Sequence, residues 1–243
     1  MKLMCVVAHP DDECFAFGGC LALAADAGVE TYVLCLTDGQ AATNRGEATT
    51  GQELGQIRRR EFAASCAVLG VKHHELLDYQ DGRLEFESFP KVAGRLVERM
   101  RRFRPDVVVT FGADGGLNTH PDHMMVSMFT TAAFHWSGQP RRYPDLATAH
   151  AATRFFHLSA KFLLPNRQLP KPIPWSVTLD ITGVQARKEA AFREHTSQAP
   201  LMEATRDLFA RFGSEEVYTL VAAPEPQAST PMSSLFDGLN DHK

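Results

Sequence analysis

Short apolar runs alternate with segments of helical pattern over the first half of this chain. The runs cover residues 3–8, 30–36 and 106–111, and the helical segments cover residues 20–27, 52–69 and 89–103. Apolar runs of about four to eight residues are typical of strands that are buried on both faces. Strands that alternate with helices in this way form βαβ units around a parallel sheet. We therefore expect a Rossmann-like α/β fold, with a mainly parallel sheet and helices on both faces.

The second half of the chain follows this alternation less regularly. We expect strands at residues 175–181 and 217–222, helices at residues 183–195 and 201–212, and an extended proline-rich loop at residues 165–174. A chain of 243 residues is long enough to bury one substantial core. We therefore expect a single domain over residues 1–223, followed by a mobile tail over residues 224–243 that is rich in proline and serine.

Charge and cysteine content exclude several classes of protein. A net charge of -4 gives no electrostatic basis for binding nucleic acid or an anionic membrane. No apolar stretch reaches the length of a membrane span, and the N-terminal apolar run stops too early for a signal peptide. Five cysteines, an odd number, do not form a disulfide framework and fit a reducing compartment. We expect a cytoplasmic enzyme with a small-molecule substrate and no membrane insertion, either a monomer or a homo-oligomer.

Two short motifs place histidine and carboxylate groups beside a proline. The first is Ala8-His9-Pro10-Asp11-Asp12-Glu13, directly after the first apolar run, and the second is His120-Pro121-Asp122-His123, beyond the run that ends at Phe111. Ligands of parallel α/β sheets bind beyond the carboxyl ends of the strands. Both motifs are therefore expected at this edge of the sheet, where they would meet in one site.

The side chains of the two motifs suit a catalytic zinc ion. Such an ion takes three protein ligands and keeps a position for water. His9, Asp12 and His123 would supply nitrogen, oxygen and nitrogen. Asp11, next to a ligand but not itself bound, would be free to take a proton from the bound water, which the metal acidifies.

The second motif also offers an acid–base group. His120 would act as the electrophilic or acid partner, with Asp122 holding its other ring nitrogen in one tautomer. The alternative for either motif is structural, because His-Pro-Asp is also a turn signal in which the aspartate caps a following helix. The pairing of two such motifs at two strand ends favours the metal site over the turn-and-cap interpretation.

Together the motifs closely resemble those of the LmbE-like, PIG-L superfamily of zinc-dependent N-acetylglucosamine deacetylases. Gly18-Gly19 after the first motif fits the same family, as do Thr37-Asp38-Gly39 and Arg104-Pro105-Asp106. Matches continue as far as Lys188 and the stretch His195-Thr196-Ser197-Gln198, so the resemblance covers roughly residues 1 to 200. It implies a Rossmann-like sheet, which agrees with the strand pattern.

The resemblance implies hydrolysis of an N-acetyl amide on an amino sugar or a related small molecule, with release of acetate. Zinc would be held by His9, Asp12 and His123, and Fe²⁺ is an alternative metal in the cell. Arg58 would reach the substrate. Its alternative is an ion pair with Glu61, three residues further along the same helix.

The resemblance also implies that Asp11 is the general base, that His120 stabilises the tetrahedral intermediate and that Asp122 orients His120. One departure matters, because some family members that handle amino-sugar thiols have a Tyr-Gly pair where this chain has Asn118-Thr119. Asn118 can still donate a hydrogen bond to an oxyanion. A tyrosine-assisted mechanism does not transfer.

Two rival functions stay open beside the deacetylase: an amidase that acts on amino-sugar thiol conjugates, and a catalytically silent binding protein of the same fold. A nucleotide-binding protein is disfavoured, because no Gly-x-Gly-x-x-Gly opens the first helix. The loops at residues 40–51 and 165–174 are candidates for substrate selection.

Four further residues have open roles. Asp38 would either orient a ligand histidine or cap a turn, and Asp81 is expected in a turn, with a place in the lining of the pocket as its alternative. His195 is expected at the end of a helix, where a cation suits the dipole, with a place near the pocket as its alternative. Cys14 is expected to be a buried thiol, with redox sensitivity of the site as its alternative.

Overall fold

The computed structural model describes residues 1–116, 118–160, 175–224 and 232–239. Within these residues the strands form one seven-stranded sheet. Its members are β1 (Lys2–Val7), β2 (Glu30–Thr37), β3 (His73–Tyr79), β4 (Val107–Phe111), β5 (Arg154–Ser159), β6 (Val177–Asp180) and β7 (Glu215–Ala222). The α-helices are α1 (Asp12–Phe15), α2 (Gly18–Asp26), α3 (Gly51–Leu69), α4 (Phe89–Phe103), α5 (Pro121–Ser137), α6 (Gln185–Arg193), α7 (Ala199–Ala204) and α8 (Arg206–Phe212). Three short 3₁₀ helices are η1 (Leu84–Phe86), η2 (Thr182–Val184) and η3 (Thr196–Gln198).

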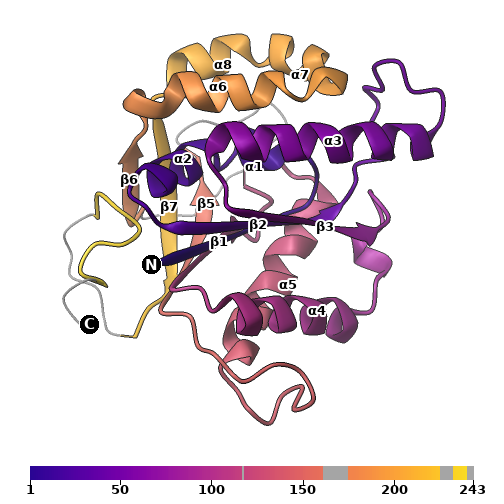
Figure 1. Ribbon diagram of the computed structural model, residues 1–243. Coiled ribbons are helices and arrows are strands. Elements are labelled where there is room, and N and C mark those ends of the chain that lie inside the picture. Colours follow the sequence, from indigo (N-terminus) through magenta and orange to yellow (C-terminus); the bar gives the residue numbers. More distant parts are fainter. Residues whose placement is uncertain (117, 161–174, 225–231, 240–243) are drawn as a thin grey trace.

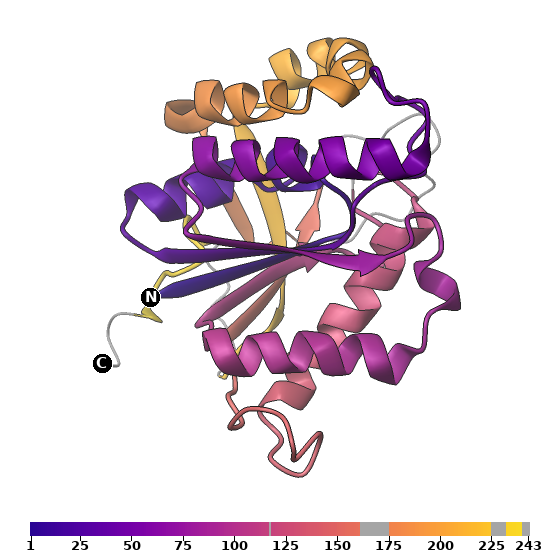
Figure 2. The ribbon, with the colours of Figure 1, turned by 45° about the vertical axis from the view of Figure 1, so that its right-hand side comes forward.

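The strand order is β3-β2-β1-β4-β5-β7-β6. The first five strands in this order are parallel, and β7 runs antiparallel to both β5 and β6. Figures 1 and 2 show α4 and α5 on one face of the sheet and α2, α3 and α6 on the other. The prediction of a mainly parallel α/β sheet with helices on both faces is confirmed. The strand β5 and the antiparallel pairing of β7 were not predicted.

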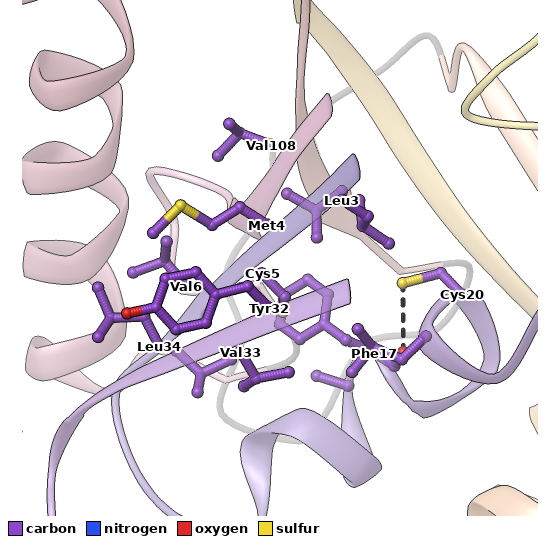
Figure 3. Close-up of a cluster of buried hydrophobic side chains, with 14 of the residues drawn as sticks. Leu3, Met4, Cys5, Val6, Phe17, Cys20, Tyr32, Val33, Leu34 and Val108 are labelled. Carbon is purple, nitrogen blue, oxygen red and sulfur yellow. Dashed lines mark hydrogen bonds between the residues drawn. The ribbon is translucent and has the colours of Figure 1, made fainter. Parts of the chain in front are cut away.

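The core is built around β1, which lies between β2 and β4. All side chains from Leu3 to Val7 are fully buried, as a strand covered on both faces requires. Figure 3 shows Leu3, Met4, Cys5 and Val6 packed with Val33 and Leu34 of β2 and with Phe17 at the start of α2. Each fully buried side chain of this size contributes about 1.5–3 kcal/mol to stability. This packing fixes the end of β1, after which the first motif begins.

Helix α3 is delimited by its own sequence. The Thr50 side chain accepts the backbone N–H of Glu53, and the Glu53 carboxylate accepts the backbone N–H of Thr50. These two bonds form a complete capping box. The helix ends at Gly70, whose φ of 80° is in the left-handed region that glycine adopts without strain. Both ends of this long helix are therefore specified locally, and its bounds agree closely with the expected helix at residues 52–69.

The described part of the C-terminal segment lies against the domain. Met232 forms an isolated bridge with Val177, and Leu235 is buried. The guanidinium of Arg154 donates to the Leu235 carbonyl at 3.2 Å. The other residues of the expected tail, 225–231 and 240–243, and the proline-rich loop 165–174 lie outside the described residues. In the described part of the chain, no helix has the length and hydropathy that crossing a membrane requires.

A buried ion pair joins α6 to the antiparallel part of the sheet. Lys188 Nζ lies 2.6 Å from Glu216 Oε1, and both side chains are almost fully buried. The Glu216 carboxylate also accepts the backbone N–H groups of Gly19 and Cys20 at the start of α2, and the hydroxyl of Tyr218 at 2.7 Å. The carboxylate therefore ties β7 to two helices.

Lys188→Met is expected to lower the free energy of unfolding by about 3 kcal/mol, because the Glu216 carboxylate stays buried without its cation. The three remaining hydrogen bonds keep the loss at the lower end of the range for broken buried pairs. Urea denaturation of the wild type and the variant measures it. A loss below about 1 kcal/mol would mean that this pair behaves like one at the surface.

Candidate active site

The first motif forms the turn that follows β1. The Oδ2 atom of Asp12 accepts the backbone N–H groups of Ala8 at 3.1 Å and His9 at 2.8 Å. These bonds fold the chain back at the strand end and orient the Asp12 carboxylate. The other oxygen, Oδ1, lies 3.2 Å from Nε2 of His123 in the second motif. The two motifs therefore meet at the carboxyl edge of the sheet.

The second motif lies at the start of α5. His120 is the N-cap residue, and its Nδ1 accepts the backbone N–H of Asp122 at 3.2 Å. His123 stacks on Phe111, the last residue of β4, with ring centroids 4.0 Å apart and planes 7° apart. Strand β4 thus holds the His123 ring through Phe111, and the start of α5 holds the His120 ring.

Ring nitrogens from three histidines gather in this place. His9, His120 and His123 offer nitrogen atoms that all lie within 4.8 Å of one another, a spacing at which they could hold a metal ion. The ring centroid of His9 is 4.7 Å from that of His120 and 5.3 Å from that of His123. His9 and His123 are buried, and His120 is partly exposed.

Two of these histidines each direct one ring nitrogen, here called the outer nitrogen, towards a hydrogen-bond acceptor other than Asp12. His9 Nε2 lies 2.9 Å from Oδ1 of Asp81 and 3.3 Å from Oδ2 of Asp122. His123 Nδ1 lies 3.2 Å from the carbonyl oxygen of Gly115. Histidines that ligate metals nearly always place the second ring nitrogen on a carboxylate or a carbonyl in this way.

The inner nitrogens of the same histidines face Asp12. His9 Nδ1 is 3.5 Å from Asp12 Oδ2, and His123 Nε2 is 3.2 Å from Asp12 Oδ1. His120 differs, because its Nδ1 accepts a backbone N–H, so a neutral His120 carries its proton on Nε2. A protonated nitrogen does not ligate a metal. The Asp12 carboxylate, which faces the ring nitrogens of both His9 and His123, could hold a metal ion together with these two histidines.

The histidines and carboxylates of the site strongly shift one another's pKa values. Burial lowers the pKa of His9, but the carboxylates of Asp12, Asp122 and Asp81 outweigh it and raise this pKa well above the ordinary value. Burial raises the pKa of Asp12, but the neighbouring His123 outweighs it and holds this pKa well below the ordinary value. Burial and the charges of the two other histidines lower the pKa of His120. A metal ion would replace the proton on His9.

Asp11 has an unusual backbone conformation. Its φ of 110° is positive, which costs a residue other than glycine on the order of 1–3 kcal/mol. Although Asp11 is the N-cap residue of α1, its side chain makes no capping bond, so its carboxylate is available to the site. Burial raises the pKa of Asp11 to about 6, partly offset by the guanidinium of Arg58.

Arg58 lies behind Asp11. Its Nη2 donates to Asp11 Oδ2 at 3.0 Å and to the carbonyl of Pro10, and its Nη1 donates to the carbonyl of Gly39 at 3.0 Å. Gly39 has a φ of 66°, and a side chain there would collide with this guanidinium. Glu61 instead accepts bonds from Thr196 and Ser197, so the alternative ion pair with Arg58 is not formed.

The contacts of Asp122 differ from the expected ones. Its carboxylate accepts the backbone N–H groups of Gly82 at 2.7 Å and Leu84 at 3.2 Å, and it lies beside His9. Only its backbone N–H contacts His120. The reason is geometric, because the N-cap histidine turns its ring towards the helix start, whereas the Asp122 side chain points away towards η1. Asp122 thus orients His9, not His120 as expected.

A cavity of about 450 Å³ opens over these residues. Its polar lining includes Asp11, Arg58, His120, Asn44 and Gln198, and the apolar lining includes Phe15, Phe111 and Leu201. Asn118 also lines it, and the Oδ1 atom of Asn118 accepts the backbone N–H of His120 at 3.0 Å. Residues 41–44 of the loop expected to select substrates contribute to the same wall.

The remaining candidate residues, Asp38, Cys14 and Asp81, have different contacts. Asp38 pairs with Arg59 and does not contact a ligand histidine. Cys14 is a buried thiol whose pKa is raised by burial, and its Sγ donates to the Asp11 carbonyl at 3.1 Å. Asp81 lies in a turn, as expected, and its carboxylate also lines the cavity and holds His9. The signal for Asp81 was its place just after β3, at the same sheet edge as both motifs.

The chain matches the family model named PIG-L, GlcNAc-PI de-N-acetylase, over residues 4–134. It is 31% identical to a 1D-myo-inositol 2-acetamido-2-deoxy-alpha-D-glucopyranoside deacetylase of Salinispora arenicola, over 98% of this chain and 91% of that protein. It is also 31% identical to a mycothiol S-conjugate amidase of Streptomyces coelicolor, over 60% of this chain and 55% of that protein.

Among solved structures, the N,N'-diacetylchitobiose deacetylase of Pyrococcus horikoshii aligns with a TM-score of 0.73. The alignment covers 90% of this chain and 83% of that chain, at 26% identity. The matched family region contains both motifs and reaches from β1 into α5. With the sequence, the fold and the family model in agreement, this chain belongs to the PIG-L family of LmbE-like proteins.

Proposed function

We propose that this protein is a metal-dependent hydrolase that removes the acetyl group from an N-acetylated amino sugar or a related small amide. The observation that carries the proposal is the arrangement of two histidines around Asp12. Their outer nitrogens are held by Asp81, Asp122 and the Gly115 carbonyl, while their inner nitrogens face Asp12. The deacetylases among its relatives support the same reaction class.

Zn²⁺ is the metal that best suits one carboxylate oxygen and two imidazole nitrogens at a catalytic site. His9, Asp12 and His123 would hold it, and Fe²⁺ is an alternative because imidazole and carboxylate ligands suit it as well. When bound, the metal would polarise the acetyl carbonyl and lower the pKa of water at the site.

The proton transfers are assigned to Asp11 and His120. Asp11 takes a proton from the attacking water and delivers it to the amine as the carbon–nitrogen bond breaks, which leaves acetate and a free amine. The Nε2–H of His120 donates to the carbonyl oxygen, whose negative charge grows in the tetrahedral intermediate. Arg58 supports this chemistry by fixing the Asp11 carboxylate at 3.0 Å.

Substrate recognition is assigned to the cavity walls. Asn44, Asn118 and Gln198 offer amide groups that can bond sugar hydroxyls, and Phe15 and Leu201 offer an apolar surface. We also propose that residues 1–223 act as one domain in the cytoplasm. The five cysteines of the chain are all buried thiols, which suits a reducing compartment.

Acetate release from N-acetylglucosamine and its conjugates tests the function. We expect about one metal ion per chain, hydrolysis that stops when a chelator removes the ion, and recovery when zinc is added back. Hydrolysis that persists in metal-free protein contradicts the metal assignment. Bound metal without release of acetate from any N-acetylated sugar contradicts the deacetylase.

The amidase is the second candidate, favoured by the likeness to the mycothiol S-conjugate amidase. The same site would then cleave an amide in an amino-sugar thiol conjugate. Competition between an N-acetylated sugar and a thiol conjugate of the same sugar separates the two, because the preferred substrate has the higher kcat/KM.

A further inference from the structure

Glu13, the last residue of the first motif, lies behind Asp11 and does not line the cavity. Its side chain is fully buried. The Oε2 atom accepts the backbone N–H of Asp11 at 2.9 Å. Because Asp11 has a positive φ, this bond holds a peptide group in a conformation that the residue would not adopt by preference. The backbone N–H of Asp11 therefore faces Glu13, and Asp11 lines the cavity on its other side.

Two donors from distant segments hold the other oxygen of Glu13. Oε1 accepts the hydroxyl of Ser65, on α3, at 2.5 Å and lies 2.7 Å from Nε2 of His195, which follows α6. Ser65 and His195 are both buried. Among the described residues, Nδ1 of His195 has no hydrogen-bond partner. The hydrogen bond of this imidazole is therefore made to Glu13, directly behind the proposed base.

Charge supports the same arrangement. Burial lowers the pKa of His195, but Glu13 outweighs it and raises this pKa above the ordinary value. Burial raises the pKa of Glu13, but His195 and Ser65 outweigh it, so the carboxylate stays charged. A buried charge is tolerated only when it is paired and hydrogen-bonded. One oxygen of this charged carboxylate binds the Asp11 peptide, and the other binds Ser65 and His195.

We propose that Glu13, Ser65 and His195 form a positioning group for Asp11. The group fixes the Asp11 peptide in its left-handed conformation, and this conformation directs the carboxylate towards Arg58 and the cavity. His195 acts through Glu13 and touches neither the substrate nor the metal ligands. The proposal rests on the proposed function for its effect on turnover, but the conformation of Asp11 can be observed without any reaction.

The test compares three variants of the metal-loaded protein. His195→Leu removes the donor to Glu13, and we expect kcat for acetate release to fall roughly 10–100-fold, as for other partners that orient catalytic groups. KM and metal content should not change. His195→Gln supplies an amide N–H in place of the imidazole and should recover most of kcat. Lys188→Met is the matched control, because it breaks a buried ion pair on α6, the helix that precedes His195, away from Asp11. Its kcat should stay near that of the wild type.

Crystal structures of the wild type and His195→Leu give the second readout. We expect Asp11 to leave its positive φ, or its carboxylate to leave Arg58, in the variant. An unchanged Asp11 together with an unchanged kcat overturns the proposal, as does an equal loss of kcat in the Lys188→Met control. If the wild type releases no acetate from any substrate, the proposed function fails. The crystal structures alone then decide whether His195 holds Asp11.

Discussion

Asp11→Asn is expected to keep its metal and lose most of its turnover, roughly 10²–10⁴-fold in kcat, which is the usual contribution of a positioned acid–base group. Asparagine has nearly the same shape as aspartate, and its amide oxygen can still accept from Arg58. It cannot take a proton from water. The loss should therefore fall on kcat, with little change in KM, because the cavity keeps its shape.

Metal analysis and steady-state kinetics of the same preparation measure this result. Asp78→Asn is the matched control, since Asp78 is an exposed carboxylate that pairs with Arg95 near the end of β3. The control should retain wild-type kcat and metal content. If Asp11→Asn keeps kcat within about tenfold of the wild type, Asp11 is not the base.

His123→Ala is expected to lose both metal and activity. The variant removes one of the three proposed ligands and also the ring that stacks on Phe111. Loss of a residue that hydrogen-bonds a metal ligand already lowers metal affinity about 10–100-fold, so loss of a ligand itself should lower it at least that much. Zinc content after dialysis against a weak chelator should fall well below that of the wild type.

The outer partners of His9 provide a graded series for the same experiment. Asp81→Asn keeps the shape but weakens the acceptor for His9 Nε2, so its metal affinity should lie between those of the wild type and His123→Ala. His73→Ala, at an exposed histidine that pairs with Glu30, should change nothing. Unchanged zinc content in His123→Ala would remove His123 from the ligand set.

The elements that carry the motifs follow from local patterns. β1 and β4 are short, mainly apolar runs, and Thr50 and Gly70 cap the two ends of α3. β5 has no such pattern, because Arg154 and His157 interrupt it. Arg154 is buried nonetheless, since its guanidinium donates to the Leu235 carbonyl far along the chain. No local pattern records a contact of that kind.

Some features of the site could likewise be predicted from the sequence, and others could not. Strand order alone brings both motifs to one sheet edge, and the choice of His9, Asp12 and His123 follows from donor chemistry. Which histidine Asp122 faces depends on how α5 is rotated relative to the end of β3, and spacing does not encode that rotation. Glu13 belongs to the first motif, yet its partner His195 is 182 positions away.

This separation has a consequence for the order in which the protein matures. During synthesis, His9, Asp12 and His123 leave the ribosome well before His195, so a nascent chain that ends near residue 134 already holds every proposed ligand. In such a chain the Glu13 carboxylate would lack its imidazole partner. The last third of the polypeptide, which contributes none of the proposed ligands, would then determine when a nascent chain becomes a working enzyme.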